Sequence, residues 1–298
     1  MKKQIPISLY FVTVILLVLT VCGSFWDLQI ANAIYMGETP SDNLFGILVS
    51  YIGVIPTFVG WSFLGASILC LAKKQIRDIR KRRRLIAFSI LLFLLSFFYF
   101  CNTLYISNAN AFPIHFAVAY SIGLAVICPA AYLGYRLSQK NEDPCLLKKA
   151  LFLAAITLIT LIIISFTKEL MCRPRFRFIL ATNNPAYFRN WWKSGRSLKM
   201  SLAANTVTDE FASFPSGHSG YAMFAIFLFP ALGDYVTGLR KFKPYLFFFG
   251  FLWWAVTAFS RLTVGAHFLT DVTIAGLVTI LAYTILSIGN RIFRFTNP

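Results

Sequence analysis

Long apolar runs constrain this chain more than any other feature of its sequence. A helix needs about 20 mostly apolar residues to cross a membrane, and eight apolar runs bounded by charges, Pro or Gly cover over half of the 298 residues. We therefore predict an all-α polytopic membrane protein with about eight transmembrane helices. The runs comprise residues 5–23, 44–72, 85–105, 112–135, 150–167, 218–232, 245–260 and 268–289.

Composition agrees with a membrane protein. Charged residues make up 13% of the chain, about half of what soluble domains carry, which argues against a soluble enzyme. The net charge of +17, in so apolar a chain, indicates anionic lipid headgroups as partners and no nucleic acid. The six cysteines are scattered singly, without a CxxC pair, so we predict neither a disulfide framework nor structural zinc.

The distribution of Lys and Arg predicts an orientation. With the N-terminus inside, alternating crossings place most of these cations, including the cluster at 73–84, on the cytoplasmic side. We expect an integral protein of a bacterial cytoplasmic membrane with both termini in the cytoplasm. The first run is interpreted as an uncleaved helix. Residues 1–84 would form two N-terminal helices and a basic cytoplasmic loop, and residues 85–298 a core with a long outer loop at 168–217.

Two polar segments flank this outer loop. Lys168, Arg173 and Arg175 lie where the fifth run reaches the outer surface, although interfacial snorkelling alone would explain such cations. The segment PSGH, residues 215–218, directly precedes the sixth run. Its residue types suit ordinary helix capping, but a helix N-terminus also offers backbone N–H groups to an anion.

A third polar segment lies on the same predicted side. Ser260 and Arg261 are followed by His267 and, four residues later, by Asp271. In a helix this spacing places His267 and Asp271 on one face, where the carboxylate can hold one imidazole nitrogen. The chain's remaining histidine, His115, begins the fourth run without a charged neighbour, and we interpret it as structural.

Together these groups suit phosphate chemistry. Fixed cations, helix-end amides and a Ser hydroxyl can cradle a tetrahedral dianion. His267, oriented by Asp271, is the candidate nucleophile, and His218 is the candidate general acid. The segments hold no acidic cluster of the kind that binds catalytic Mg²⁺, so no metal and no other cofactor is predicted.

The three segments resemble the type 2 phosphatidic acid phosphatase superfamily, whose pattern is K-x6-RP, PSGH and SR-x5-H-x3-D. The second and third elements fit fully. In the first, Lys168 and Arg175 have the family spacing, but Phe176 stands where the family has Pro. A competing register would use Arg173 and Pro174, with the spacing shortened to four. The resemblance covers residues 85–290 and implies a six-helix core formed by the last six runs.

The resemblance also implies roles for individual residues. His267 would form a phosphohistidine and Asp271 would orient it. His218 would protonate the leaving group and then activate water, without a metal. The residues implied to bind phosphate are Lys168, Arg175, Arg261, Ser216 and the Gly217 amide.

Aromatic and cationic residues alternate in the outer loop between residues 187 and 199. An interfacial aromatic belt explains this pattern, and a lid that binds a second phosphate or a sugar-phosphate headgroup is the sharper hypothesis. The candidate headgroup contacts are Arg173, Arg189, Lys193, Arg196 and Lys199.

The sequence thus predicts a metal-independent lipid phosphatase that acts on a lipid phosphate or diphosphate at the outer face of the bilayer. A phosphotransferase using the same site is the enzymatic alternative, and a vanadate haloperoxidase ranks far below it because its known relatives are soluble. An anion transporter would need charge near the bilayer midplane, where the runs carry almost none and Asp27, just after the first run, supplies none. No GxxxG pattern supports an oligomer prediction.

Overall fold

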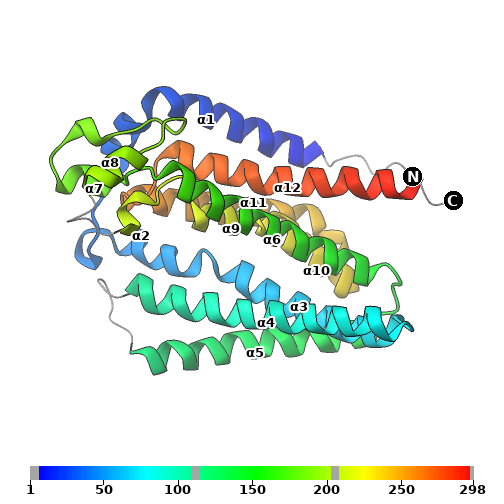
Figure 1. Ribbon diagram of the computed structural model, residues 1–298. Coiled ribbons are helices and arrows are strands. Elements are labelled where there is room, and N and C mark those ends of the chain that lie inside the picture. Colours follow the sequence, from blue (N-terminus) through cyan, green and yellow to red (C-terminus); the bar gives the residue numbers. More distant parts are fainter. Residues whose placement is uncertain (1–6, 109–114, 203–207, 296–298) are drawn as a thin grey trace. The chain divides into compact units, whose positions relative to one another are not determined.

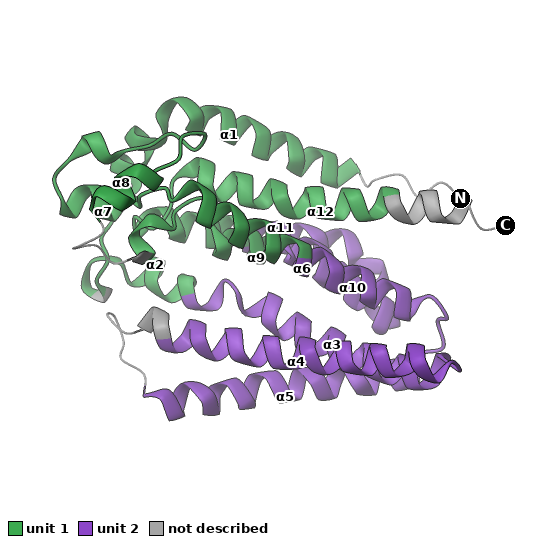
Figure 2. Cartoon of the chain, in the orientation of Figure 1, with its two compact units in different colours: residues 1–50, 159–223, 254–298 green, residues 51–158, 224–253 purple. Residues whose placement is uncertain are grey.

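The computed structural model describes residues 7–108, 115–202 and 208–295, and within these ranges it contains helices and turns but no strand (Figure 1). The chain forms two compact units (Figure 2), and each is built from segments that are distant in the sequence. The two units group segments that pack closely and do not test the domain boundary predicted at residue 84. That boundary stays a prediction.

The first unit, residues 1–50, 159–223 and 254–298, contains all the predicted site residues. In it α12 packs against α1 and α9. Gly220 permits the close approach, because a Cβ at this position would lie only 2.3 Å from Ile164 Cδ1. The helices wholly or largely in this unit are α1 (Ile7–Ile34), α2 (Pro40–Ile52), α7 (Phe176–Ala181), α8 (Arg196–Ser201), α9 (Gly217–Met223) and α12 (Leu269–Phe295).

The second unit, residues 51–158 and 224–253, is organised around α3. This helix packs against α4 and α5, and Trp61 at its centre is fully buried and donates to Thr157 Oγ1 at 2.7 Å. His115 precedes α5 and its Nδ1 accepts from the Ala117 amide, consistent with a structural role. The elements here are α3 (Ile55–Gln75), α4 (Ile79–Asn108), α5 (Phe116–Lys140), α10 (Ala225–Tyr235) and the 3-10 helix η3 (Thr237–Phe242). The unit boundaries at 159 and 254 fall within α6 (Leu146–Met171) and α11 (Lys243–Thr263).

Among the described residues, seven helical segments are long and apolar enough to span a membrane. They correspond to seven of the eight predicted runs. The sixth run, 218–232, forms two consecutive shorter helices, α9 and α10, separated at Phe224. The first run was predicted too short, since α1 continues past a kink at Trp26 to Ile34 and so includes Asp27.

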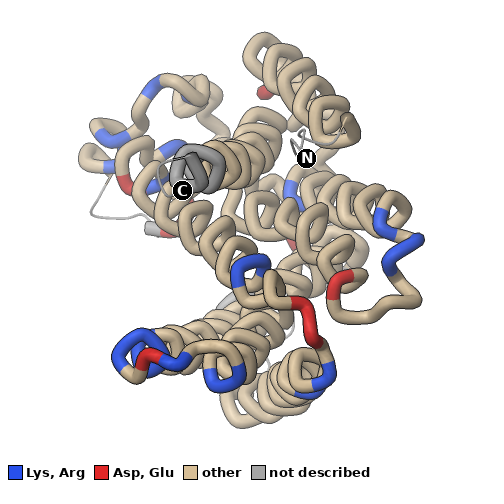
Figure 3. Tube along the Cα trace, turned by 90° about the vertical axis from the view of Figure 1, so that its right-hand side faces the viewer, with Lys and Arg blue, Asp and Glu red and all other residues tan. Residues whose placement is uncertain are grey.

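Lys and Arg, blue in Figure 3, lie mostly in turns and at helix ends. The run of cations predicted as a cytoplasmic anchor occupies the end of α3, the following turn and the first turns of α4. This placement keeps charged groups out of the apolar middle of each span, where they are costly.

Candidate active site

The ends of several helices in the first unit bring the three predicted polar segments together. Ser216 N donates to the carbonyl of Asp271 at 3.0 Å, and Ser213 N donates to the carbonyl of Arg173 at 3.1 Å. The segment before α9 is thereby tied both to α12 and to the chain after α6. The predicted catalytic and phosphate-binding residues placed around this junction are Lys168, Arg175, Ser216, Gly217, His218, Arg261, His267 and Asp271.

The turn between α11 and α12 explains the spacing of Arg261 and His267. Gly265 has φ +64°, a left-handed conformation that glycine adopts without steric cost. The Gly265 amide donates to Leu262 O, and the Ala266 and His267 amides both donate to Arg261 O. These bonds form a Schellman-type helix end, which fixes the backbone of His267 against the last turn of α11.

His267 is held through its Nδ1 atom. Nδ1 lies 2.6 Å from the Ser213 carbonyl oxygen, and because a carbonyl can only accept, Nδ1 carries the proton of the neutral ring. The Nε2 lone pair is then available for chemistry. His267 precedes α12 and so does not lie on the helix face where it was predicted, but it does pair with Asp271, with Nδ1 3.8 Å from Asp271 Oδ2. Proximity of the two groups was predicted correctly, but a backbone carbonyl makes the closer bond.

Asp271 is a fully buried carboxylate with several donors. Oδ2 accepts from Ser213 Oγ at 2.5 Å and from the Phe268 amide at 2.8 Å, and Oδ1 accepts from Arg173 Nη1 at 2.6 Å. Such a set of donors stabilises the ionised form. Ser213 therefore contacts both His267 and Asp271, and the sequence analysis missed it because its main contribution is a backbone carbonyl, which any residue type carries.

Arg173 was wrongly predicted as a headgroup contact. Its side chain is 0% exposed and pairs with Asp271 and, through Nη2 at 2.9 Å, with Asp27. Nε donates to the Arg189 carbonyl, and the guanidinium carbon lies 4.2 Å from the centre of the Phe268 ring. A buried cation needs such partners, and Arg173 cannot reach a lipid headgroup from this position.

Arg175 lies nearer the surface, with a carboxylate beside it. Nη2 donates to Asp209 Oδ1 at 2.9 Å, and the Asp209 side chain is 61% exposed. Arg175 Nε is buried and has no hydrogen-bond partner among the described residues. The neighbouring Arg177 is instead paired with Glu210, Nε to Oε2 at 3.0 Å, and with Glu38.

The remaining cations and the PSGH segment complete the site. Arg261 Nη1 donates to Ser50 Oγ of α2 at 2.5 Å. The half-buried Lys168 donates to the Ala212 carbonyl, and its Cε lies 3.9 Å from where a Cβ on Gly217 would stand. Ser216 Oγ accepts from the Ser219 amide and bonds the Ser219 hydroxyl, the capping role that its position before α9 suggested.

Both histidines lie in a cationic environment. Burial, followed by the charges of neighbouring groups, lowers the pKa of His218 well below 6.5, and the cations concerned are Arg261, Arg175 and Lys168. Burial and the same cations lower the pKa of His267. Within the described part of the chain, His218 Nε2 is buried without a hydrogen-bond partner. These surroundings favour the neutral form of both imidazoles.

The other predicted loop residues lie outside this cluster of contacts. Arg189 Nη1 donates to the carbonyls of Ala186 and Phe188, and Arg196 Nη2 donates to the Glu169 carbonyl. Arg196 and Lys193 are exposed, and Lys199 is half-buried. Their proposed contact with headgroups stays a prediction.

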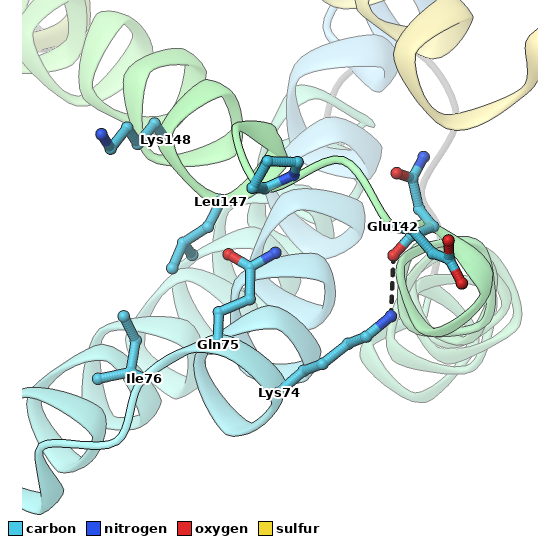
Figure 4. Close-up of a pocket in the computed structure, with 8 residues that line it drawn as sticks. Lys74, Gln75, Ile76, Glu142, Leu147 and Lys148 are labelled. Atoms are coloured by element: carbon cyan, nitrogen blue, oxygen red, sulfur yellow. Dashed lines mark hydrogen bonds between the residues drawn. The ribbon is translucent and has the colours of Figure 1, made fainter.

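A pocket in the second unit is separate from these residues (Figure 4). It lies near the ends of α3 and α5, and Lys74 Nζ donates across it to the Asn141 carbonyl at 3.0 Å. Glu142 and Lys148 also line it. None of the predicted site residues does.

The fold and the site define a helical membrane protein with a cationic, histidine-containing centre. The model of the PAP2 superfamily matches residues 149–292, and this part of the chain belongs to that superfamily. Its members are phosphatases, which supports a hydrolase acting on phosphate esters. No curated protein and no solved structure gives a match. The matched region begins later than residue 85, where the resemblance set the start, and it leaves out α1 and α2.

Proposed function

We propose that the protein is a metal-independent lipid phosphatase that hydrolyses a lipid phosphate or diphosphate through a phosphohistidine on His267. The observation that carries the proposal is the bond from His267 Nδ1 to the Ser213 carbonyl, which leaves Nε2 as an unprotonated nucleophile. Membership of the matched region in the PAP2 superfamily supports the phosphatase class.

The cations around the histidines are suited to a phosphate dianion. Arg175 has a buried Nε without a described partner, and its charge, with those of Lys168 and Arg261, acts on both imidazoles. Positive groups fixed in advance stabilise charge that develops on the phosphoryl oxygens. We assign Arg175 to this set in preference to Arg173, because two carboxylates already neutralise Arg173.

The reaction would proceed in two steps. His267 Nε2 attacks phosphorus while the bond from phosphorus to the lipid oxygen breaks, and protonated His218 gives its proton to that oxygen. In the second step His218 takes a proton from water, the resulting hydroxide attacks phosphorus, and the bond to His267 breaks. A bound dianion opposes the cations that lower the pKa of His218, so substrate binding favours the protonated acid that the first step needs.

We place this site at the outer face of a bacterial cytoplasmic membrane, with both termini in the cytoplasm. The support is the distribution of Lys and Arg among the turns (Figure 3). Substrate would then come from the outer leaflet, and phosphatidate, phosphatidylglycerol phosphate, undecaprenyl diphosphate and a lipid A phosphate all have the required chemistry. The exposed Lys193 and Arg196 are candidate contacts for the rest of a headgroup.

The test measures phosphate released by detergent-purified protein from phosphatidate, phosphatidylglycerol phosphate and undecaprenyl diphosphate in the presence of EDTA. We expect EDTA-resistant release by the wild type, with rates that rank the lipids, and none by His267→Ala. Lys140→Ala, which replaces an exposed cation of α5 in the second unit, is the control for the effect of a substitution by itself.

The proposal has two clear failures. If EDTA abolished phosphate release, a metal-independent mechanism would be excluded. Absence of free phosphate together with a newly phosphorylated acceptor lipid would show that the enzyme is a phosphotransferase.

A further inference from the structure

Two helices outside the matched region contribute polar contacts to the candidate active site. Ser50 of α2 accepts from Arg261, and Asp27 of α1 accepts from Arg173. Both Ser50 and Asp27 lie within residues 1–84, outside the predicted core and its predicted site residues. The contacts of Asp27 are the more extensive, and they lead to the catalytic residues.

Asp27 is buried, with 4% exposure, and has three donors. Its Oδ1 accepts from the Thr270 amide at 3.0 Å. Its Oδ2 accepts from Arg173 Nη2 at 2.9 Å and from the Thr270 hydroxyl. Thr270 immediately precedes Asp271, and Arg173 Nη1 bonds both of these residues. Asp27 and Asp271 therefore share one guanidinium.

The shape of α1 delivers this carboxylate to the site. The backbone departs from helical geometry at Trp26, directly before Asp27. One turn earlier, Gly23 allows α1 to approach the start of α12, since a Cβ there would lie 2.8 Å from Thr270 Cγ2 and 2.9 Å from Asp27 Oδ1. A side chain at position 23 would displace either the threonine or the carboxylate.

We propose that Asp27 is a positioning residue for the phosphatase reaction: it anchors Arg173 and Thr270 and, through Arg173, maintains the contacts of Asp271 and Ser213 that orient His267. The inference rests on the function proposed above. Asp27 does not touch the reacting atoms, so its effect passes through Arg173 to Asp271, then to Ser213 and His267.

Charge explains why the effect should reach His267. With Asp27 neutralised, the Arg173 charge is balanced by Asp271 alone, and the surroundings of His267 become more positive. The charged and titratable groups that act on His267 are Asp271, which favours its protonated form, and Lys168, Arg261, Arg175 and His218, which oppose it. A more positive site lowers the basicity and the nucleophilicity of the imidazole.

The test compares four variants for phosphate release per folded protein. Asp27→Asn removes the charge, and Asp27→Glu keeps it. Gly23→Ala keeps every charge but places a methyl group against the carboxylate. Asp42→Asn is the matched control, because Asp42 is exposed and its carboxylate bonds Thr39 and Ser41 beside it at the start of α2.

We expect kcat to fall roughly tenfold in Asp27→Asn and in Gly23→Ala, a coupling typical of residues in one polar network. KM should change little, because no phosphate-binding cation is removed. The acid limb of the pH profile of kcat should move about one unit lower in Asp27→Asn. Asp27→Glu should retain the wild-type limb, and Asp42→Asn should behave as the wild type.

If Asp27 had a purely structural role, its substitution would lower the amount of folded protein. The kcat of the folded fraction and the acid limb of its pH profile would then be unchanged, and that result would overturn the proposal. If Asp27→Asn does not fold, Gly23→Ala carries the test, and a wild-type kcat in that variant overturns it equally. Phosphate release that survives in His267→Ala would instead overturn the proposed function itself.

Discussion

At the residue scale, the site depends on cations that have different tasks despite their proximity in sequence. Arg173 and Arg175 are two positions apart, yet the first is enclosed by Asp27 and Asp271 and the second has an exposed carboxylate beside it. Sequence spacing cannot distinguish these tasks, because the partners of Arg173 come from the distant helices α1 and α12.

Arg173→Met should destabilise the fold by about 3–5 kcal/mol, because it leaves two buried carboxylates without their shared cation. Thermal unfolding in detergent measures this effect, with exposed Arg196→Met as the matched control. Equal stability of the two variants would contradict the buried arrangement and return Arg173 to the set of headgroup contacts.

The pH dependence of kcat/KM should reflect the lowered pKa of His267. In the proposed mechanism the nucleophile is the neutral imidazole, and a lowered pKa keeps it neutral as pH falls. The rate should therefore be lost only below pH 6.5, the ordinary value. The profile should be measured with two substrates whose phosphate groups have different pKa values, because a limb caused by substrate ionisation would differ between them. An acid limb at or above pH 6.5 with both substrates would contradict its assignment to His267.

The sequence predicted the residue types of the site but only part of their geometry. His218, Arg261 and His267 could be found because charged and titratable side chains are rare in so apolar a chain. Ser213 and Ser50 could not be found, because Ser213 contacts His267 through its backbone carbonyl and Ser50 contributes a single hydroxyl, and no sequence motif marks either group. Asp27 was misjudged because the apolar run before it was taken to end at Gly23, whereas α1 continues through a kink.

At the element scale, the segment 168–217 contributes a short 3-10 helix to the candidate site. The 3-10 helix η2 (Thr208–Phe211) presents Asp209 to Arg175, while the backbone amide of Arg175 donates to the Glu210 carbonyl. Asp209 thus occupies a donor that a phosphate oxygen would use. The Asp209 side chain is 61% exposed, so solvent screens its attraction to Arg175, and we expect substrate to displace this carboxylate.

Asp209→Asn should lower KM by up to about fivefold, since a neutral amide competes less well with phosphate for Arg175. The kcat should not rise, because the catalytic histidines are unchanged. Steady-state kinetics measures both constants, and exposed Glu142→Gln in the second unit controls for the change in net charge. A raised KM in Asp209→Asn would mean that the carboxylate orders Arg175 for substrate.

Element boundaries were the weaker part of the sequence prediction. Hydropathy located every long apolar helix, because burial in lipid requires that composition whatever the neighbouring helices are. It could not show that residues 217–235 form two helices, since α9 and α10 share one continuous apolar pattern. The turn at Gly265, by contrast, is of a kind that a sequence can indicate, because a glycine just after the end of a helix is typical of such turns.

At the scale of the whole molecule, the ion pair between Arg173 and Asp271 constrains the topology. It brings the chain after α6 and the start of α12 to the same place, so an even number of crossings must separate them. Because α11 is long enough to cross, we expect α9 and α10 to cross together as a second, interrupted span. Counted with the seven long helical segments, this interrupted span would give the eight crossings that the sequence predicted.

Cysteine labelling can test this topology. Gly238, in η3, has open space around the position of a Cβ, so Gly238→Cys should fold normally. With a membrane-impermeant maleimide on intact cells, we expect Ser194→Cys to be labelled, and Gly238→Cys and the exposed native Cys145 only after permeabilisation. Labelling of Gly238→Cys in intact cells would show that α9 and α10 do not cross.

The shared guanidinium of Arg173 has a further consequence for how the protein is made. Asp27 precedes Arg173 by 146 residues and Thr270 by 243 residues, so a ribosome delivers an apolar helix with an acid in it long before its partners exist. Until then that acid must stay protonated or near the headgroups. Because α12 brings Thr270 to Asp27 and Asp271 to Arg173, we expect packing of this helix to complete the proposed site, so that assembly of the bundle and gain of activity coincide late in biogenesis.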